Sequence, residues 1–114
     1  MNSKSLVRPD ARLSVNFTSL VGRVVVAYLD LVRVFGQPNR GSSGDNKVDC
    51  EWVLRTPSGV ATIYNYKSGK NYLGDDGLDV EYIRDWHIGG RNSVVADHVT
   101  NALGEADVVF GIVK

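Results

Sequence analysis

The chain has 114 residues, 43% of them hydrophobic, which is enough for one domain with its own hydrophobic core. Thirteen basic and thirteen acidic residues give a formal net charge of zero. Because binding of duplex nucleic acid depends on neutralising phosphates, this balance argues against a duplex-binding surface and allows only a local basic patch. No stretch has the length and apolar character of a signal peptide or a transmembrane helix, so we expect an intracellular protein without a membrane partner.

The start of the chain predicts an arm followed by two strands. Residues 1–12 are polar and contain a proline, so we expect a flexible N-terminal arm ahead of a single domain that spans residues 13–114. Only a partner or the edge of a sheet would order this arm. Apolar and polar residues alternate from Leu13 to Thr18, which predicts a half-buried strand, and Gly22 separates it from a second strand over residues 23–27.

A short helix is predicted after the second strand. Its apolar stripe follows the helical spacing i, i+3, i+4 and i+7 and consists of Tyr28, Leu31, Val32 and Phe35. We expect the helix to end at Phe35, because Gly36 suits a left-handed cap and Pro38 prevents continuation. Residues 24–26 could extend either the strand or the helix. The polar, glycine-containing residues 39–46 predict a flexible loop.

Residues 48–67 show the sharpest local pattern, that of a β-hairpin. Alternating residues lie on both sides of the turn formers Thr56-Pro57-Ser58-Gly59, and symmetric closure of the turn would place Arg55 opposite Val60. One face is then apolar, formed by Trp52, Leu54, Ala61 and Ile63. The other combines polar and aromatic residues, namely Asp49, Glu51, Val53, Thr62, Tyr64 and Tyr66.

The remaining sequence predicts one more strand, a second helix and an apolar end. A glycine-rich connection with several acidic residues precedes a short strand over residues 85–88. A helix over Ser93–Leu103 follows, with Asn92 or Ser93 as N-cap and Gly104 as C-cap. The apolar residues 108–113 form either a strand or a segment docked on the core. The chain therefore predicts an α+β fold, with an antiparallel sheet of about four to five strands and two helices packed on one face.

A candidate anion site lies directly before the second helix. Gly89, Gly90 and Arg91 would place free backbone N–H groups, the helix dipole and a guanidinium close together. The alternative is a plain strand-to-helix turn that requires glycine for its backbone angles, since the segment matches neither phosphate-binding glycine motif.

A catalytic site is the weakest of the candidates. His87 shares a strand face with Asp85, as in an acid–base pair, but the sequence places no nucleophile beside them. The single cysteine, Cys50, belongs to the apolar side of the hairpin, where we expect a buried free thiol. One cysteine and two distant histidines predict no zinc site, and the acidic residues 75–81 lack the ligand order of a calcium loop. We therefore expect no enzymatic activity and no cofactor.

A candidate binding surface lies at the end of the hairpin. This surface combines aromatic and basic side chains that can anchor a protein partner or stack bases, namely Tyr64, Tyr66 and Tyr72 with Lys67, Lys70 and Arg91. The alternative is cross-strand packing of the tyrosines without any ligand, and the sequence leaves both interpretations open.

Several short motifs follow one another along the chain, in the order Leu20-Val21-Gly22, Phe35-Gly36-Gln37-Pro38, Lys47-Val48-Asp49-Cys50-Glu51-Trp52, Ala61-Thr62-Ile63-Tyr64-Asn65-Tyr66-Lys67 and Trp86-His87-Ile88-Gly89-Gly90. In this order they resemble the motifs of a group of small bacteriophage-encoded proteins that carry no assigned activity. The resemblance covers the chain from Phe17 to about Val99. It implies a phage accessory protein that acts in the host cytoplasm and binds a host protein, with inhibition of a host defence as one such role.

We therefore expect a non-enzymatic binding protein whose partner is a host protein. The alternative is a protein that sequesters a nucleotide or another small anionic ligand through the glycine-arginine segment, and self-association into a homo-oligomer is compatible with both. The expected binding residues are Tyr64, Tyr66, Lys67, His87, Gly89, Gly90 and Arg91.

Overall fold

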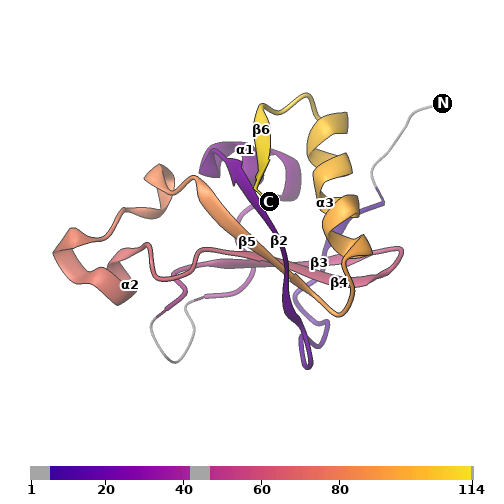
Figure 1. Ribbon diagram of the computed structural model, residues 1–114, viewed down its shortest axis with the longest axis horizontal. Helices are drawn as coiled ribbons and strands as arrows, with labels where there is room; N and C mark the ends of the chain where they lie inside the picture. The colour runs from indigo at the N-terminus through magenta and orange to yellow at the C-terminus, as the bar shows by residue number, and fades with distance from the viewer. Residues whose placement is uncertain (1–5, 42–46, 114) are drawn as a thin grey trace.

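The computed structural model describes residues 6–41 and 47–113 (Figure 1). Its strands are β1 (Arg8–Pro9), β2 (Ser19–Val26), β3 (Glu51–Thr56), β4 (Gly59–Tyr64), β5 (Asp85–Gly90) and β6 (Phe110–Val113). Its helices are α1 (Tyr28–Phe35), α2 (Lys70–Leu73) and α3 (Val94–Glu105), with the 3-10 turns η1 (Gly74–Asp76) and η2 (Val80–Tyr82) between α2 and β5. Every strand pair is antiparallel, and the order across the sheet is β1-β3-β4-β5-β2-β6.

The α+β class and the antiparallel sheet are confirmed, but the element count was predicted too low. The described residues contain six strands and three helices, where four to five strands and two helices were expected. The additional helix, α2, is a single turn of four residues with no buried side chain. The apolar C-terminal run is a strand, β6, which pairs with β2.

One face of the sheet is buried beneath α1 and α3, which lie on the same side of it (Figure 1). At the centre of this core, the rings of Trp52 and Trp86 meet edge to face with 5.4 Å between their centroids. Each indole N–H is paired, since Trp52 Nε1 donates to the carbonyl of Gly36 at 2.8 Å and Trp86 Nε1 to that of Val26 at 3.0 Å. Truncation of either ring to alanine would cost about 3–5 kcal/mol.

Two local predictions are confirmed in detail. Helix α1 ends at Phe35, and Gly36 has a φ of 84° and donates its N–H to the carbonyl of Val32. In the hairpin, Arg55 lies opposite Val60 and Glu51 opposite Tyr64, as symmetric closure of the turn requires. The apolar side of the hairpin is fully buried: Trp52, Leu54, Ala61 and Ile63 all have 0% exposure.

The strand predicted from Leu13 to Thr18 is wrong. This segment is a loop that turns at Phe17, whose φ is 64°, and β2 begins only at Ser19. The polar residues that suggested alternation instead bind backbone groups: Ser14 Oγ accepts from the N–H of Asn16, and Thr18 Oγ1 donates to the carbonyl of Val15. Such local bonds compete with strand formation.

Gly22 does not separate two strands, because it lies within β2 next to an irregularity in the pairing with β5. A Cβ at Gly22 would come within 3.0 Å of the Cβ of Ala96 in α3. The glycine therefore allows α3 to approach the sheet closely.

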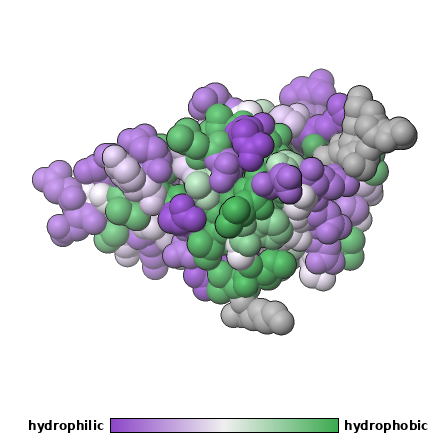
Figure 2. All heavy atoms as spheres, turned by 90° about the horizontal axis from the view of Figure 1, so that it is seen from above, coloured by the Kyte–Doolittle hydropathy of each residue, from purple (hydrophilic) through white to green (hydrophobic). Residues whose placement is uncertain are grey.

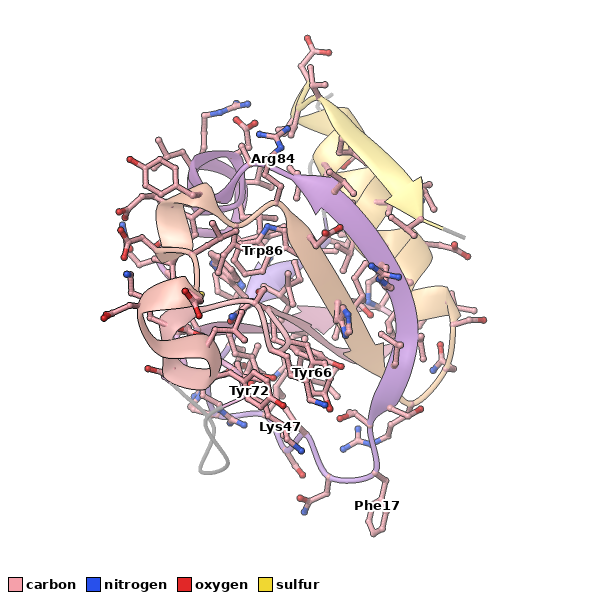
Figure 3. The ribbon with its side chains drawn as sticks, turned by 60° about the vertical axis from the view of Figure 1, so that its left-hand side comes forward. Phe17, Lys47, Tyr66, Tyr72, Arg84 and Trp86 are labelled. Carbon is pink, nitrogen blue, oxygen red and sulfur yellow. The ribbon has the colours of Figure 1, made fainter. Side chains whose placement is uncertain are left out.

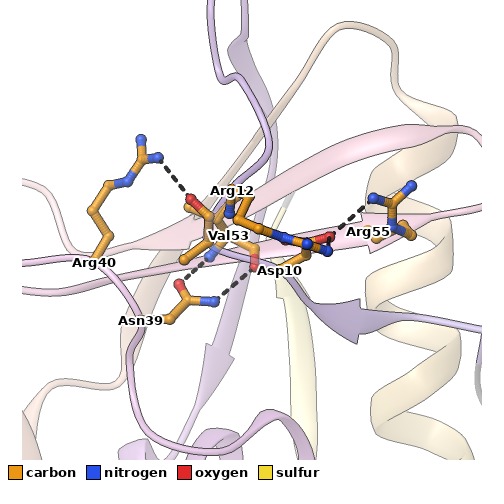
Figure 4. A network of polar contacts seen from close by, with 7 residues as sticks. Asp10, Arg12, Asn39, Arg40, Val53 and Arg55 are labelled. Carbon is orange, nitrogen blue, oxygen red and sulfur yellow. Dashed lines mark hydrogen bonds and ion pairs between the residues drawn. The ribbon is translucent and has the colours of Figure 1, made fainter.

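The segment before β2 and the loop after α1 both lie along the outer edge of β3 (Figure 4). Arg8 and Pro9 pair with β3, so this part of the arm has the sheet-edge contact that would order it. The amide of Asn39 binds both backbone groups of Val53, at 2.7 and 3.0 Å. Arg40 forms an antiparallel bridge with Glu51. The flexible loop predicted over residues 39–46 is thus bound to the sheet at its first two residues. Residues 42–46 of this loop and residues 1–5 of the arm lie outside the described residues.

Helix α3 is longer than predicted at its C-terminal end. It runs through Gly104 to Glu105, and its C-cap is Ala106. At the other end, Asn92 Oδ1 accepts from the N–H of Val94 at 3.0 Å. One face of α3 packs on the sheet through Val95, Val99, Ala102 and Leu103.

Candidate functional site

Tyr64 and His87 meet on the face of the sheet opposite the tryptophans. Tyr64 ends β4 and lies directly across from His87 of β5, so their side chains point to the same side. Their rings are 5.5 Å apart and meet edge to face. The hairpin and the strand over residues 85–88 were predicted separately, and the pairing of β4 with β5 brings two of their candidate residues into contact.

Tyr66 and Lys67 extend this contact beyond the end of β4. The ring of Tyr66 stacks on His87 with a centroid distance of 5.4 Å and an interplanar angle of 26°. Lys67 Nζ lies 5.2 Å from the centroid of the Tyr66 ring and 5.5 Å from that of Tyr72, as in a cation–π pair. We call Tyr64, Tyr66, Lys67, Tyr72 and His87 the tyrosine cluster.

The cluster offers rings and one cation to solvent. Tyr66 and Tyr72 are 41% and 46% exposed, whereas Tyr64 and His87 are half-buried. Burial, aided by nearby Arg23, lowers the pKa of His87 against the opposing effect of Asp85, and burial raises the pKa of Tyr64. His87 is therefore neutral at neutral pH and acts in the cluster as an aromatic ring.

A buried asparagine holds the cluster in place. Asn65, with 0% exposure, accepts at Oδ1 from the N–H groups of Asp49 and Cys50 at 2.8 and 3.2 Å, and its Nδ2 donates to Asp49 Oδ1 at 3.0 Å. Lys67 donates its backbone N–H to the carbonyl of Lys47 at 2.7 Å. These bonds join the segment that carries Tyr66 to the segment that precedes β3, so the surface is built on a fixed frame.

The importance of Asn65 was missed in the sequence. The sequence did contain a signal for it: Asn65 is a polar residue two positions after Ile63, on the strand face that Ala61 and Ile63 give to the core. A side chain at such a position must find hydrogen-bond partners in the interior.

The predicted turn at Gly89 and Gly90 is wrong, because both glycines are part of β5. They pair with β4 on one side and with β2 on the other, so their backbones belong to the interior of the sheet. Neither has a positive φ. A Cβ at Gly89 would collide with Thr62 Oγ1, and one at Gly90 with Val95 Cγ2. Glycine is required here by close packing and not by backbone angles.

Arg91 is directed away from the tyrosine cluster and holds the loop before β2. Its Nε donates to the carbonyl of Asn16 at 3.0 Å and one terminal nitrogen to that of Ser14 at 3.1 Å. Of the glycine-arginine segment only Gly89 lies beside the cluster, since a Cβ at this position would be 3.4 Å from the ring of Tyr64.

The loop fixed by Arg91 exposes an aromatic residue that was assigned to a strand. Phe17 is 94% exposed, and Figure 3 shows it at the tip of its loop, pointing away from the body of the molecule. The signal for this turn was the spacing of Ser14, Asn16 and Thr18, all of which favour local side-chain bonds to the backbone.

The thiol of Cys50 and the Ser58–His98 pair have the residue types of reactive groups, but each lies in surroundings that indicate a structural role. Cys50 is a buried free thiol, as predicted, and burial raises its pKa to about 12, far from that of a reactive thiolate. Ser58 Oγ lies 3.0 Å from His98 Nε2, a contact between the hairpin turn and α3 that the sequence did not reveal. Asn92 Nδ2 reinforces it by donating to the carbonyl of Ser58.

Neither a scan against protein-family models nor a search of curated proteins finds a match for this chain. Within residues 6–41 and 47–113, no group of three or more His, Cys, Asp or Glu side chains is placed to hold a metal ion. The helices of this part of the chain are also too short or too polar to cross a bilayer.

Proposed function

We propose that this chain is a non-enzymatic binding protein that captures another protein through its tyrosine cluster. The observation that carries the proposal is the exposed array of Tyr66, Lys67 and Tyr72 on a frame fixed by Asn65. Tyrosines that are partly exposed and already ordered lose little conformational entropy on binding, which is why they are frequent in the energetic centres of interfaces.

The partner that we propose is a bacterial host protein, and the setting is the host cytoplasm. This part of the proposal rests on the resemblance to bacteriophage-encoded proteins, as does a role in inhibiting a host defence. The neutral His87 and the single ammonium of Lys67 favour a partner surface that offers apolar contacts and a carboxylate.

The test is affinity capture from a bacterial lysate with matched tyrosine variants. Tyr66→Ala and Tyr72→Ala remove exposed rings of the cluster, and Tyr82→Ala removes a 66% exposed ring elsewhere, in η2. We expect a protein retained by the wild-type chain and by Tyr82→Ala to bind Tyr66→Ala about tenfold more weakly or worse. Equal retention by all variants would overturn the proposal.

Tyr64→Ala is a less specific variant, because Tyr64 also packs beside Gly89 and is half-buried. Its effect on capture therefore has to be compared with its effect on the free energy of unfolding.

The nucleotide-binding alternative has lost part of its geometric basis. Arg91 already donates to two backbone carbonyls, and Gly89 and Gly90 lie inside the sheet. We expect no change in thermal midpoint with nucleoside mono-, di- or triphosphates. A ligand at a hundredfold its dissociation constant would add about 2.7 kcal/mol, so an upward shift with any of them would favour this alternative.

A further inference from the structure

The two edges of the sheet differ in how they are finished. At one edge, β1 has only two residues, one of them Pro9, and Asn39 and Arg40 also bind along the outside of β3. At the other edge lies β6, which pairs with β2 on its inner side and is the last strand in the order of the described sheet. Among the described residues, the features that prevent a sheet from adding strands are found at the first edge.

The outer edge of β6 is apolar and accessible. Its sequence, Phe110-Gly111-Ile112-Val113, contains no charge and no proline. Ile112 is 62% exposed and the preceding Val109 is 84% exposed. Figure 2 looks onto the side of the molecule that carries α1, β6 and α3 and shows hydrophobic atoms gathered across its middle. A strand edge of this kind is a template for further pairing.

A second copy of the same chain fits this edge. The formal net charge of zero means that two copies do not repel each other through their overall charge. In an antiparallel pair of β6 strands centred on Gly111, Phe110 of one copy lies opposite Ile112 of the second, and Val109 opposite Val113. Each exposed apolar residue then gains an apolar neighbour on the same face.

Gly111 suits the central position of such a pair. No atom lies within 4 Å of the position that a Cβ at Gly111 would occupy, so the face of the sheet at the axis has no side chain that would crowd the second copy. The contact is the same on both copies, as a two-fold axis requires.

We propose that two copies of the chain associate through β6, in antiparallel register centred on Gly111, and join their sheets into one. The tyrosine cluster takes no part in this contact, so dimer formation can be measured independently of any binding partner.

Disulfide trapping tests the register. The open space at Gly111 accepts the Gly111→Cys side chain, and the two thiols would face each other across the axis under mild oxidation. Val109→Cys is the matched control, because its two thiols would be about 13 Å apart in this register, beyond the reach of a disulfide. The native Cys50 is buried in both variants.

We expect a cross-linked dimer from Gly111→Cys in at least tenfold larger yield than from Val109→Cys. Failure of Gly111→Cys to cross-link, or equal yields from the two variants, would overturn the proposed register.

Sedimentation of the free protein tests the association itself. The wild-type chain should sediment with twice the mass of one chain, and Ile112→Lys, which places a charge beside the edge, should sediment as a monomer. Leu29→Lys, at a 68% exposed site on α1, should remain dimeric. A monomeric wild type, or a dimer that Ile112→Lys leaves intact, would overturn the proposal.

Discussion

Phe17 combines an exposed ring with a backbone conformation that suits few residues. Its φ of 64° costs a non-glycine residue about 1 kcal/mol or more, and its 94% exposure leaves the ring with little to contribute to the core. A residue that is unfavourable for the fold and held outward by a fixed loop is a candidate for contact with a partner.

The variant Phe17→Asn tests how little Phe17 contributes to stability. Asparagine tolerates the left-handed conformation better than phenylalanine, so the free energy of unfolding should stay the same or rise by up to about 1 kcal/mol. Urea denaturation measures the change. A loss of stability beyond about 1 kcal/mol would mean that the ring packs on the folded chain.

Asp10 joins the N-terminal segment to the hairpin. Its carboxylate accepts hydrogen bonds from Arg12 at 3.1 Å and from Arg55 at 2.9 Å (Figure 4). These two guanidinium groups, Arg12 foremost, hold the pKa of Asp10 well below its ordinary value of 3.8. Because the pKa is lower in the folded than in the unfolded chain, ionised Asp10 stabilises the fold at neutral pH.

Asp10→Asn should therefore lower the free energy of unfolding at neutral pH. The stabilisation is complete above the unfolded pKa of about 4 and is lost as the pH falls toward the folded value, so the difference between variant and wild type should narrow below about pH 4. Urea midpoints over a pH series measure this difference. A gap that stays constant down to about pH 2 would contradict the role given to the carboxylate.

At the scale of elements, close packing explains the two glycines that end β5. Gly90→Ala would push a methyl group into Val95 of α3, and overpacking of this kind costs about 1–3 kcal/mol. Gly104→Ala is the matched control, since Gly104 lies inside α3 with no atom near its would-be Cβ. It should raise stability by up to about 1 kcal/mol through helix propensity. Urea denaturation of both variants checks the opposite signs, and equal effects would contradict the packing argument.

The elements that could be predicted are those determined by neighbours in sequence. The stripe of α1 and its cap at Gly36 are local, and the hairpin register follows from a turn in which Thr56 Oγ1 donates to the carbonyl of Gly59. The end of β5 could not be predicted, because two glycines before a helix look like a turn unless the approach of Val95 and Thr62 is known.

The strand predicted for residues 13–18 was wrong for a different reason. Six alternating residues are too few to specify a strand, and here the side chains of Ser14 and Thr18 form local hydrogen bonds with the backbone that stabilise a loop instead.

In the whole molecule, the sheet edge at β1 and the tyrosine cluster are formed by contacts between residues that are far apart in the sequence. β1 forms because Arg8 and Pro9 pair with Arg55 and Leu54 of the neighbouring strand β3. A strand of two residues is too short to show a period in the sequence. The candidate site shows the same division. The sequence named Tyr64, Tyr66, Lys67, Tyr72 and His87 among its candidates, and the fold brings these five together. Arg91, also named, instead binds the loop before β2.

The sheet separates the molecule into parts with different roles. One face and its two helices hold the core around the two tryptophans, and the other bears the tyrosine cluster. In the described part of the chain, β6 ends the sheet at one edge. We infer that partner capture and self-association use different surfaces of the sheet, so that a variant in one leaves the other unchanged.

Site-specific photo-crosslinking tests whether the tyrosine cluster touches a partner protein. A benzophenone-bearing phenylalanine replaces Tyr66 in one chain and Tyr82 in another, and both are irradiated in a bacterial lysate. We expect a discrete adduct with one bacterial protein from position 66 and none from position 82. Equal labelling from both positions, or no adduct from position 66 while the chain still captures a partner, would contradict this expectation.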